Sequence, residues 1–260
     1  MNESPEISSV LACDVGNTAV HFAHVKGGDV QPPCHMRIGE LAALGNALRE
    51  AWEHIPAPRK LVAASVNPAG LRALEAAAQD AIHEPVLVIG RDLPLPMEAD
   101  LPHPDKVGSD RLCAAVAAFD QLGVACVVAD FGTAVTIDCV NDKGVFLGGA
   151  ILPGLSAQLA SLHEKTALLP EAELAEPTWV YGKDTRQAMI GGVVFGARGA
   201  LRHLVEAYAT ELGHWPLVIV TGRDAALVVG DVADSEIVQA IVPDLVIRGV
   251  AIAYYKTLLK

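Results

Sequence analysis

One short pattern occurs twice in this chain, and it limits the possible folds more than any other feature. Residues 11–20 read LACDVGNTAV and residues 128–137 read VADFGTAVTI. In each copy an apolar stretch runs into an aspartate, a glycine and a threonine and then becomes apolar again. Short apolar stretches predict buried strands, and Asp, Gly and Asn favour turns. Each copy therefore predicts two strands joined by a tight bend.

The residues around the two copies follow the same order, which indicates an internal duplication. Each half is expected to run strand, bend, strand, hairpin turn, strand and helix. We therefore predict an α/β fold built from two similar halves. The predicted strands include residues 10–13, 19–25, 60–66, 85–89, 124–129, 134–140 and 217–221. The predicted helices are residues 38–54, 71–82, 111–121, 155–166, a long stretch entered at 184–185, and 245–259.

Two details of this pattern carry further expectations. The sequence NPAG at residues 67–70 predicts a turn between a strand and a helix. Within the long helical stretch, glycines at positions 191, 192, 196 and 199 recur near helical spacing. Because glycine lets backbones approach closely, these four predict close packing on a neighbouring helix.

Composition narrows the class of protein. The chain of 260 residues has a net charge of −12 and no run of Lys or Arg, which argues against a dedicated nucleic-acid binder. Five cysteines without a Cys-x-x-Cys pair argue against a zinc site or a disulfide framework and fit a reducing compartment. The first residues do not read as a signal peptide, and the apolar runs are shorter than a membrane span. We therefore expect a cytoplasmic protein with no nucleic-acid or membrane partner.

The two bends carry residues that suit a phosphate bound with a metal ion. Glycine lets backbone N–H groups approach a ligand, and Thr and Asn side chains add donors for phosphate oxygens. An aspartate repels phosphate but can bind Mg²⁺ or its water shell. A single bend of this kind is more simply explained as a tight turn, whereas two copies at matching places favour a ligand site. The chain has neither the usual P-loop nor a G-x-G-x-x-G motif.

A second candidate feature is VGSDRL at residues 107–112, which ends a proline-rich loop and begins a predicted helix. Ser109 and Asp110 are typical helix-capping residues, and a plain cap is one interpretation. The other is catalytic: Asp110 would accept a proton from a substrate hydroxyl, while Arg111 and the helix N-terminus would hold an anionic group. Phosphoryl transfer needs such a base and otherwise mainly alignment and charge stabilisation.

The ordered set CDVGNT, GSDR, ADFGTAVTID, GGAILPG and GKDTRQAMIGGVVFG resembles type III pantothenate kinase, from Asp14 to about Arg223. That family belongs to the acetate kinase, sugar kinase, heat-shock protein and actin superfamily. The resemblance implies duplicated ribonuclease H-like domains with the ligand cleft between the halves. The first domain would comprise residues 1–113 plus about 245–260, and the second residues 114–244 with the dimer interface.

The resemblance also implies an activity and a site. A cytoplasmic homodimer would phosphorylate pantothenate with ATP to give 4′-phosphopantothenate, the first step of coenzyme A biosynthesis, with Asp110 as general base. Mg²⁺ would accompany ATP, and Asp130 would be the ligand of a monovalent cation, K⁺ or NH₄⁺. The implied pantothenate contacts are Leu101, Gly108, Ser109, Asp110, Arg111 and Thr185. The implied ATP contacts are Asp14, Val15, Gly16, Asn17, Thr18, Ala19, Val20, His21, Gly132 and Thr133.

Two positions depart from the family pattern. Leu101 stands where the family commonly has a tyrosine, and the family's TGG is here Thr221-Gly222-Arg223. Two alternative functions therefore stay open. One is a non-catalytic regulator on the same fold, and the other is a sister kinase that acts on another small hydroxyl compound.

Overall fold

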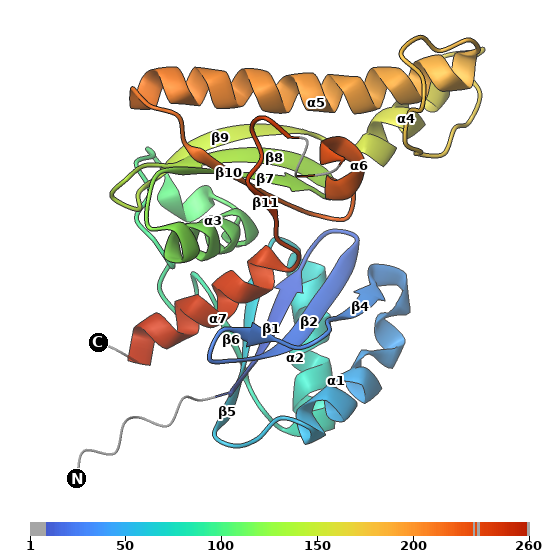
Figure 1. Ribbon diagram of the computed structural model, residues 1–260. Coiled ribbons are helices and arrows are strands. Elements are labelled where there is room, and N and C mark those ends of the chain that lie inside the picture. Colours follow the sequence, from blue (N-terminus) through green and yellow to red (C-terminus); the bar gives the residue numbers. More distant parts are fainter. Residues whose placement is uncertain (1–8, 231, 233–234, 259–260) are drawn as a thin grey trace. The chain divides into compact units, whose positions relative to one another are not determined.

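The computed structural model describes residues 9–230, 232 and 235–258, apart from the side chain of Leu41 (Figure 1). The chain divides into two compact units, which are considered separately below. Unit 1 comprises Met1–Asp120 and Asp244–Lys260, and unit 2 comprises Gln121–Pro243. Within the described residues, no helix has both the length and the apolar character needed to cross a membrane.

Unit 1 is built on a mixed sheet. Its strands are β1 (Ser9–Val15), β2 (Ala19–Lys26), β3 (Asp29–Val30), β4 (Cys34–Arg37), β5 (Arg59–Ser65) and β6 (Val86–Val88). The order is β3-β2-β1-β5-β6, and β4 also pairs with β2. Strand β1 is antiparallel to β2 and parallel to β5, which is parallel to β6. The carboxyl ends of β1 and β5 therefore lie side by side.

Helices of this unit pack on the sheet. The unit contains the 3-10 helices η1 (Ile38–Ala43) and η2 (Pro104–Lys106), and the α-helices α1 (Leu44–Glu53), α2 (Pro68–Ile82), α3 (Ser109–Leu122, whose last two residues belong to unit 2) and α7 (Leu245–Leu258). Helices α1 and α2 bury Leu48, Trp52 and Leu74 against alternate residues of β1 and β2. Helix α7 contacts β1, β2 and β5 (Figure 1).

The structure corrects one local prediction for unit 1 and refines another. Residues 67–70 form no turn between elements, because α2 already begins at Pro68. Asn67 caps this helix by accepting hydrogen bonds from the N–H groups of Ala69 and Gly70, and proline fits the first helical position because it needs no N–H partner there. The predicted helix at 38–54 is a 3-10 turn followed by α1, whose first residue has no side-chain cap.

Unit 2 repeats the same kind of sheet. Its strands are β7 (Cys126–Phe131), β8 (Ala134–Val140), β9 (Phe146–Pro153), β10 (Leu217–Thr221) and β11 (Ala240–Ile241), and its helices are α4 (Leu155–Glu164), α5 (Thr185–Leu212) and α6 (Ala225–Val229). Helix α5 begins after Asp184, whose carboxylate accepts the N–H of Gln187, and ends at Gly213 in the left-handed conformation. It runs along the sheet and buries Val194, Leu201 and Val205 against it (Figure 1).

The two sheets have matching topology, which confirms the predicted duplicated α/β fold. Unit 1 has the order β3-β2-β1-β5-β6, and unit 2, read from its other edge, has β9-β8-β7-β10-β11. The central strands β1 and β7 are each antiparallel to the next strand in sequence and parallel to the strand on their other side. The two sequence repeats are therefore the two central hairpins.

The packing predicted for the four glycines of α5 is found within the unit at one position only. A Cβ at Gly191 would touch Phe195 and Trp179, so this glycine does pack against its own chain. At Gly192, Gly196 and Gly199 a Cβ would meet no described atom within 4 Å. These three glycines lie on an open face of the helix and do not pack on another helix of the same unit.

Candidate active site

The first bend connects β1 to β2 in unit 1. The Gly16 N–H donates to the Ala19 carbonyl at 3.0 Å, which closes the bend. Asp14 and Val15 lie in β1 itself, where Asp14 pairs with His21 and Val15 with Val20. The predicted bend thus starts two residues later than the sequence pattern placed it, because the hairpin register continues to residue 15. Residues 14–21, the predicted ATP contacts in this unit, form one continuous hairpin end.

Asp14 and His21 lie on the same face of the sheet, because directly opposed residues of an antiparallel pair point the same way. His21 is in turn opposite His35 on β4, and the two rings meet edge to face at 4.4 Å between centroids. Burial, and then the neighbouring imidazole of His35, lower the pKa of His21 to about 4. His21 is therefore uncharged at neutral pH and can offer a hydrogen bond without a positive charge.

Asp110 lies in the first turn of α3, where Gly108 makes room for its carboxylate. A Cβ on Gly108 would clash with Asp110 Oδ1. The same oxygen accepts the N–H of Arg111 at 2.8 Å. Burial raises the pKa of Asp110, and this effect exceeds the opposing effects of the Arg111 N–H and the Arg111 charge. A carboxyl group with a raised pKa is a better proton acceptor once ionised, as a general base requires.

The structure places Asp14 and Asp110 at the same end of the sheet in unit 1, because Ser109 bonds to Ser65 at the end of β5 and the Val66 N–H bonds to the Val15 carbonyl. Burial raises the pKa of the Cys113 thiol on α3, and the charges of Asp14 and Asp110 raise it further. Both carboxylates are thus close enough to influence one buried thiol from β1 and from the first turn of α3. Sequence positions 14 and 110 converge because α3 starts beside the carboxyl ends of β1 and β5.

Ser109 makes the link between α3 and the sheet. Its hydroxyl accepts the Ser65 N–H at 3.0 Å and donates to the Ser65 carbonyl at 3.2 Å, at the end of β5. The side chain is buried, with 8% of the residue exposed. Its one hydroxyl proton is already used, so a substrate contact at this position would involve the remaining lone pair or the backbone.

Asn67 is a residue of this region that the sequence analysis did not single out. Its side-chain N–H donates to the Gly16 carbonyl at 3.2 Å, so it connects the cap of α2 with the first bend. The Val66 N–H donates to the Val15 carbonyl at 3.1 Å next to it. The available signal was the Asn-Pro pair, which is typical of a helix start and was interpreted as a turn.

The second bend connects β7 to β8 in unit 2. The Gly132 N–H donates to the Ala134 carbonyl at 3.1 Å, and Phe131 pairs with Val135. This bend is one residue shorter than the first, in which Val15 pairs with Val20. Asp130 is the penultimate residue of β7, which is also the place of Asp14 in β1. The two aspartates thus hold equivalent positions in the repeated hairpins.

Glycines surround the carboxylate of Asp130. A Cβ on Gly132 would lie 3.2 Å from Asp130 Oδ1, and a Cβ on Gly222 would clash with the same oxygen. Gly222 also has a φ of 94°, a backbone conformation that residues with a side chain rarely adopt. Carboxylate and backbone oxygens in such a cradle are the ligands that hard cations prefer. Thr133 is exposed at the tip of the bend.

The two remaining predicted contacts, Leu101 and Thr185, belong to different units. Leu101 is half-buried in the proline-rich segment of unit 1. Thr185 is exposed as the first residue of α5 in unit 2. The geometry within unit 1 therefore brings together the residues at 14–21 and 108–111, while Gly132, Thr133, Asp130 and Thr185 belong to unit 2.

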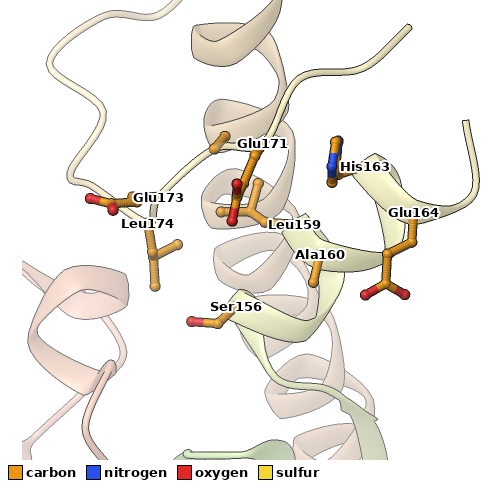
Figure 2. Close-up of a pocket in the computed structure, with 9 residues that line it drawn as sticks. Ser156, Leu159, Ala160, His163, Glu164, Glu171, Glu173 and Leu174 are labelled. Carbon is orange, nitrogen blue, oxygen red and sulfur yellow. The ribbon is translucent and has the colours of Figure 1, made fainter. Parts of the chain in front are cut away.

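A cavity of about 330 Å³ lies elsewhere, between α4 and the segment that follows it in unit 2 (Figure 2). None of the predicted contacts lines it. Its lining includes three glutamates, whose negative charge opposes the binding of an anion such as a phosphate or a carboxylate. The lining residues are Ser156, Leu159, Ala160, His163, Glu164, Glu171, Ala172, Glu173 and Leu174. Within the described part of the chain, no group of three or more His, Cys, Asp or Glu side chains is arranged to hold a metal ion.

Comparison with known proteins gives a consistent result. The sequence profile described as type III pantothenate kinase matches residues 10–207. A type III pantothenate kinase from Dehalococcoides mccartyi is 32% identical over 252 residues, covering 94% of this chain and 96% of the relative. One from Rhodospirillum rubrum is 36% identical over 260 residues, covering 94% and 97%.

Among solved structures, a protein described as a Baf family transcriptional activator from Campylobacter jejuni aligns with a TM-score of 0.58. It is 19% identical, and the alignment covers 96% of this chain and 100% of that one. The ethanolamine utilization protein EutJ from Carboxydothermus hydrogenoformans aligns with a TM-score of 0.53 at 17% identity, covering 97% and 91%. At these identities the likeness concerns the fold.

Proposed function

This chain belongs to the type III pantothenate kinase family, and from that premise we propose that it transfers the γ-phosphoryl group of ATP to pantothenate. The product would be 4′-phosphopantothenate, in the first step of coenzyme A biosynthesis. The observation that carries the proposal beyond family membership is the convergence of two carboxylates in unit 1. Asp14 lies at the end of β1 and Asp110 at the start of α3, and these ends are joined by the bonds of Ser109 to Ser65 and of the Val66 N–H to the Val15 carbonyl.

The proposed catalytic residue is Asp110. Its carboxylate accepts the proton of the primary hydroxyl of pantothenate while the hydroxyl oxygen forms a bond to the γ-phosphorus. The bond between that phosphorus and the ADP oxygen breaks, and ADP leaves. The raised pKa of Asp110 supports this role because a more basic carboxylate takes up the proton more readily. The proposed pantothenate contacts are Leu101, Gly108, Ser109, Arg111 and Thr185.

ATP is proposed to contact the bend of each unit, through residues 14–21 and through Gly132 and Thr133. Asn17 and Thr18 are exposed, and their side chains are of the kind that donates to phosphate oxygens. Asp14 offers carboxylate oxygens, the ligand type that Mg²⁺ takes, and a bound Mg²⁺ would offset the charge of the phosphates. Asp130, whose carboxylate lies beside Gly132 and Gly222, is the proposed ligand of a monovalent cation, K⁺ or NH₄⁺, because such a cation also binds to carboxylate oxygens.

The active form is proposed to be a cytoplasmic homodimer formed through the open face of α5. Gly192, Gly196 and Gly199 leave this face flat, and Phe195 lies on it with 38% of its surface exposed. Four further large apolar side chains of the same unit are also strongly exposed. They are Ile151, Leu168, Val180 and Tyr181.

The direct test is a coupled assay of ADP release with ATP, Mg²⁺ and pantothenate, run in potassium and in sodium buffer. The proposal predicts ADP formation that requires pantothenate and is faster in potassium. Equal rates in the two buffers would contradict the cation role of Asp130. The absence of pantothenate-dependent ADP formation would contradict the kinase assignment.

The same assay separates the two alternative functions. ADP release with another small hydroxyl compound, but not with pantothenate, would favour a sister kinase, for which the Leu101 departure is the motivation. ATP binding without turnover on any acceptor would favour a regulator. The structural relative described as a transcriptional activator motivates that alternative, although at 19% identity it concerns the fold alone.

A further inference from the structure

The three residues Ser65, Val66 and Asn67 lie between β5 and α2 and contact both parts of the candidate site in unit 1. We propose that Asn67 is a positioning residue that orients the phosphate-binding bend at residues 16–18. This inference rests on the proposed use of that bend for ATP. It adds a residue that touches neither substrate nor metal but determines which way the bend presents its N–H groups.

The argument starts from the peptide group between Gly16 and Asn17. A trans peptide is planar, so its carbonyl and its N–H point in opposite directions. The side-chain N–H of Asn67 donates to the Gly16 carbonyl at 3.2 Å and so draws that carbonyl toward α2. The N–H of Asn17 must then point the other way. A bend whose N–H groups face outward can bind an anion, whereas a flipped peptide would present a carbonyl to the phosphate.

Asn67 can act in this way because its own side chain is held in place. Its Oδ1 accepts the N–H groups of Ala69 at 3.1 Å and Gly70 at 3.0 Å, which leaves Nδ2 directed at Gly16. Gly70 permits the close approach, since a Cβ there would lie 2.9 Å from Val15 Cγ1. The bend is therefore fixed to the N-terminus of α2 in addition to the bond between the Gly16 N–H and the Ala19 carbonyl.

The same three residues also hold the start of α3. The Ser65 N–H and carbonyl both bond to the Ser109 hydroxyl, next to Asp110. The Val66 side chain lies 3.3 Å from where a Cβ on Gly108 would be, and the Val66 N–H bonds to the Val15 carbonyl. One short segment thus fixes the bend and the base-bearing turn relative to each other.

The test compares Asn67→Ser with the unchanged protein. Serine is an equally good helix cap but is too short to donate to the Gly16 carbonyl. We expect the dissociation constant of Mg·ADP, measured by calorimetry, and the KM for ATP to rise about five- to tenfold. This is the effect of losing one hydrogen bond, here the one from the Asn17 N–H to a phosphate oxygen. The KM for pantothenate should stay unchanged, and the melting temperature should fall only by the effect of the one lost bond to Gly16. Asn67→Ala should weaken nucleotide binding similarly and lower the melting temperature further, because it also removes the cap.

A matched control is Asn141→Ser in the hairpin turn of unit 2. Asn141 Oδ1 accepts the N–H groups of Lys143 and Val145, so this change disturbs a similar turn away from the site. It should leave nucleotide affinity unchanged. Wild-type affinity for Mg·ADP in Asn67→Ser would overturn the inference, as would losses that merely follow the melting temperature in all three variants.

Binding and turnover keep this inference distinct from the proposed function. An unchanged protein that binds Mg·ADP but does not phosphorylate pantothenate would refute the proposed function, and the Asn67 comparison would still decide the positioning role. An unchanged protein that binds no nucleotide would overturn both.

Discussion

At the scale of single residues, burial determines what the charged and titratable groups of the site can do. Asp110 has a raised pKa because burial outweighs the help of the Arg111 N–H and charge. The folded protein therefore holds a proton on this carboxyl group at pH values where the unfolded chain does not. Its contribution to stability falls as pH rises from about 3.8, the usual value, through the raised pKa.

Asp110→Asn should separate catalysis from stability. It removes the proton acceptor, so kcat should fall by about 10²–10⁴. It also removes a carboxylate that is costly to ionise in the folded state, so the melting temperature at pH 7 should equal or exceed that of the unchanged protein. Steady-state kinetics and thermal unfolding check both expectations. A variant with normal kcat would exclude Asp110 as the base.

His21 gives a prediction with the opposite dependence on pH. Its pKa is lowered to about 4 in the folded protein, so between pH 6.5 and 4 the unfolded chain binds more protons. The contribution of neutral His21 to the free energy of unfolding is therefore fully present above pH 6.5 and is lost as the pH falls toward 4. His21→Gln should therefore lose less melting temperature between pH 7 and pH 4.5.

His203→Gln, at an exposed position on α5, is the control for that series and should follow the unchanged protein. The lowered pKa of His24, due first to burial, adds its own decrease, so His21→Gln should reduce the acid-side loss without removing it. Equal losses in His21→Gln and the unchanged protein would refute this account of His21.

At the scale of elements, the hairpins β1–β2 and β7–β8 could be predicted because their alternation and turn residues are local. Helix starts were predicted less well. Asn67 and Pro68 read as a turn because Asn-Pro occurs in both settings, and only the bonds to Ala69 and Gly70 make it a cap. The edge strand β4 was missed because CHMR has little β-pattern and depends on its pairing with β2.

Helix packing in unit 1 gives an element-scale prediction. Gly249 of α7 lies directly on α3, where an added Cβ would clash with the Cys113 backbone. Gly249→Ala should lower the free energy of unfolding by about 1–3 kcal/mol or more, as overpacking does. The control is Gly45→Ala in α1, where the added Cβ would make an ordinary 3.6 Å contact with Ala81 and alanine favours the helix. Urea unfolding distinguishes the two, and a neutral Gly249→Ala would contradict the packing.

At the scale of the whole molecule, the duplication could be predicted from the repeated hairpin, and so could the residues of both bends and of the GSDR turn. The connections between them could not. Ser65 bonds to Ser109 across 44 positions of sequence and Asn67 to Gly16 across 51. Gly222 reaches Asp130 across 92 positions. Such contacts follow from strand order and register, which local patterns do not specify. The glycines of α5 predicted packing on a neighbouring helix, and within the described part of the unit no atom lies within 4 Å of a Cβ at Gly192, Gly196 or Gly199.

The proposed dimer gives the prediction at this scale. In solution the protein should have twice the mass of its 27.2 kDa chain. Gly196→Arg places a long charged side chain on the open face of α5 and should shift the protein to the monomer mass. Lys143→Glu, an exposed charge change in a hairpin turn, should leave the dimer intact. Light scattering after size exclusion provides the masses, and a dimeric Gly196→Arg would place the interface elsewhere.

The most direct test of the central claim is a crystal structure of the protein with pantothenate and a non-hydrolysable ATP analogue. The account predicts an Asp110 oxygen within about 2.6–3.2 Å of the primary hydroxyl of pantothenate. It also predicts a nucleotide phosphate bound by the N–H of Asn17 in the bend at residues 16–18. Pantothenate or nucleotide bound away from Asp110 and this bend, for example in the cavity beside α4, would contradict it.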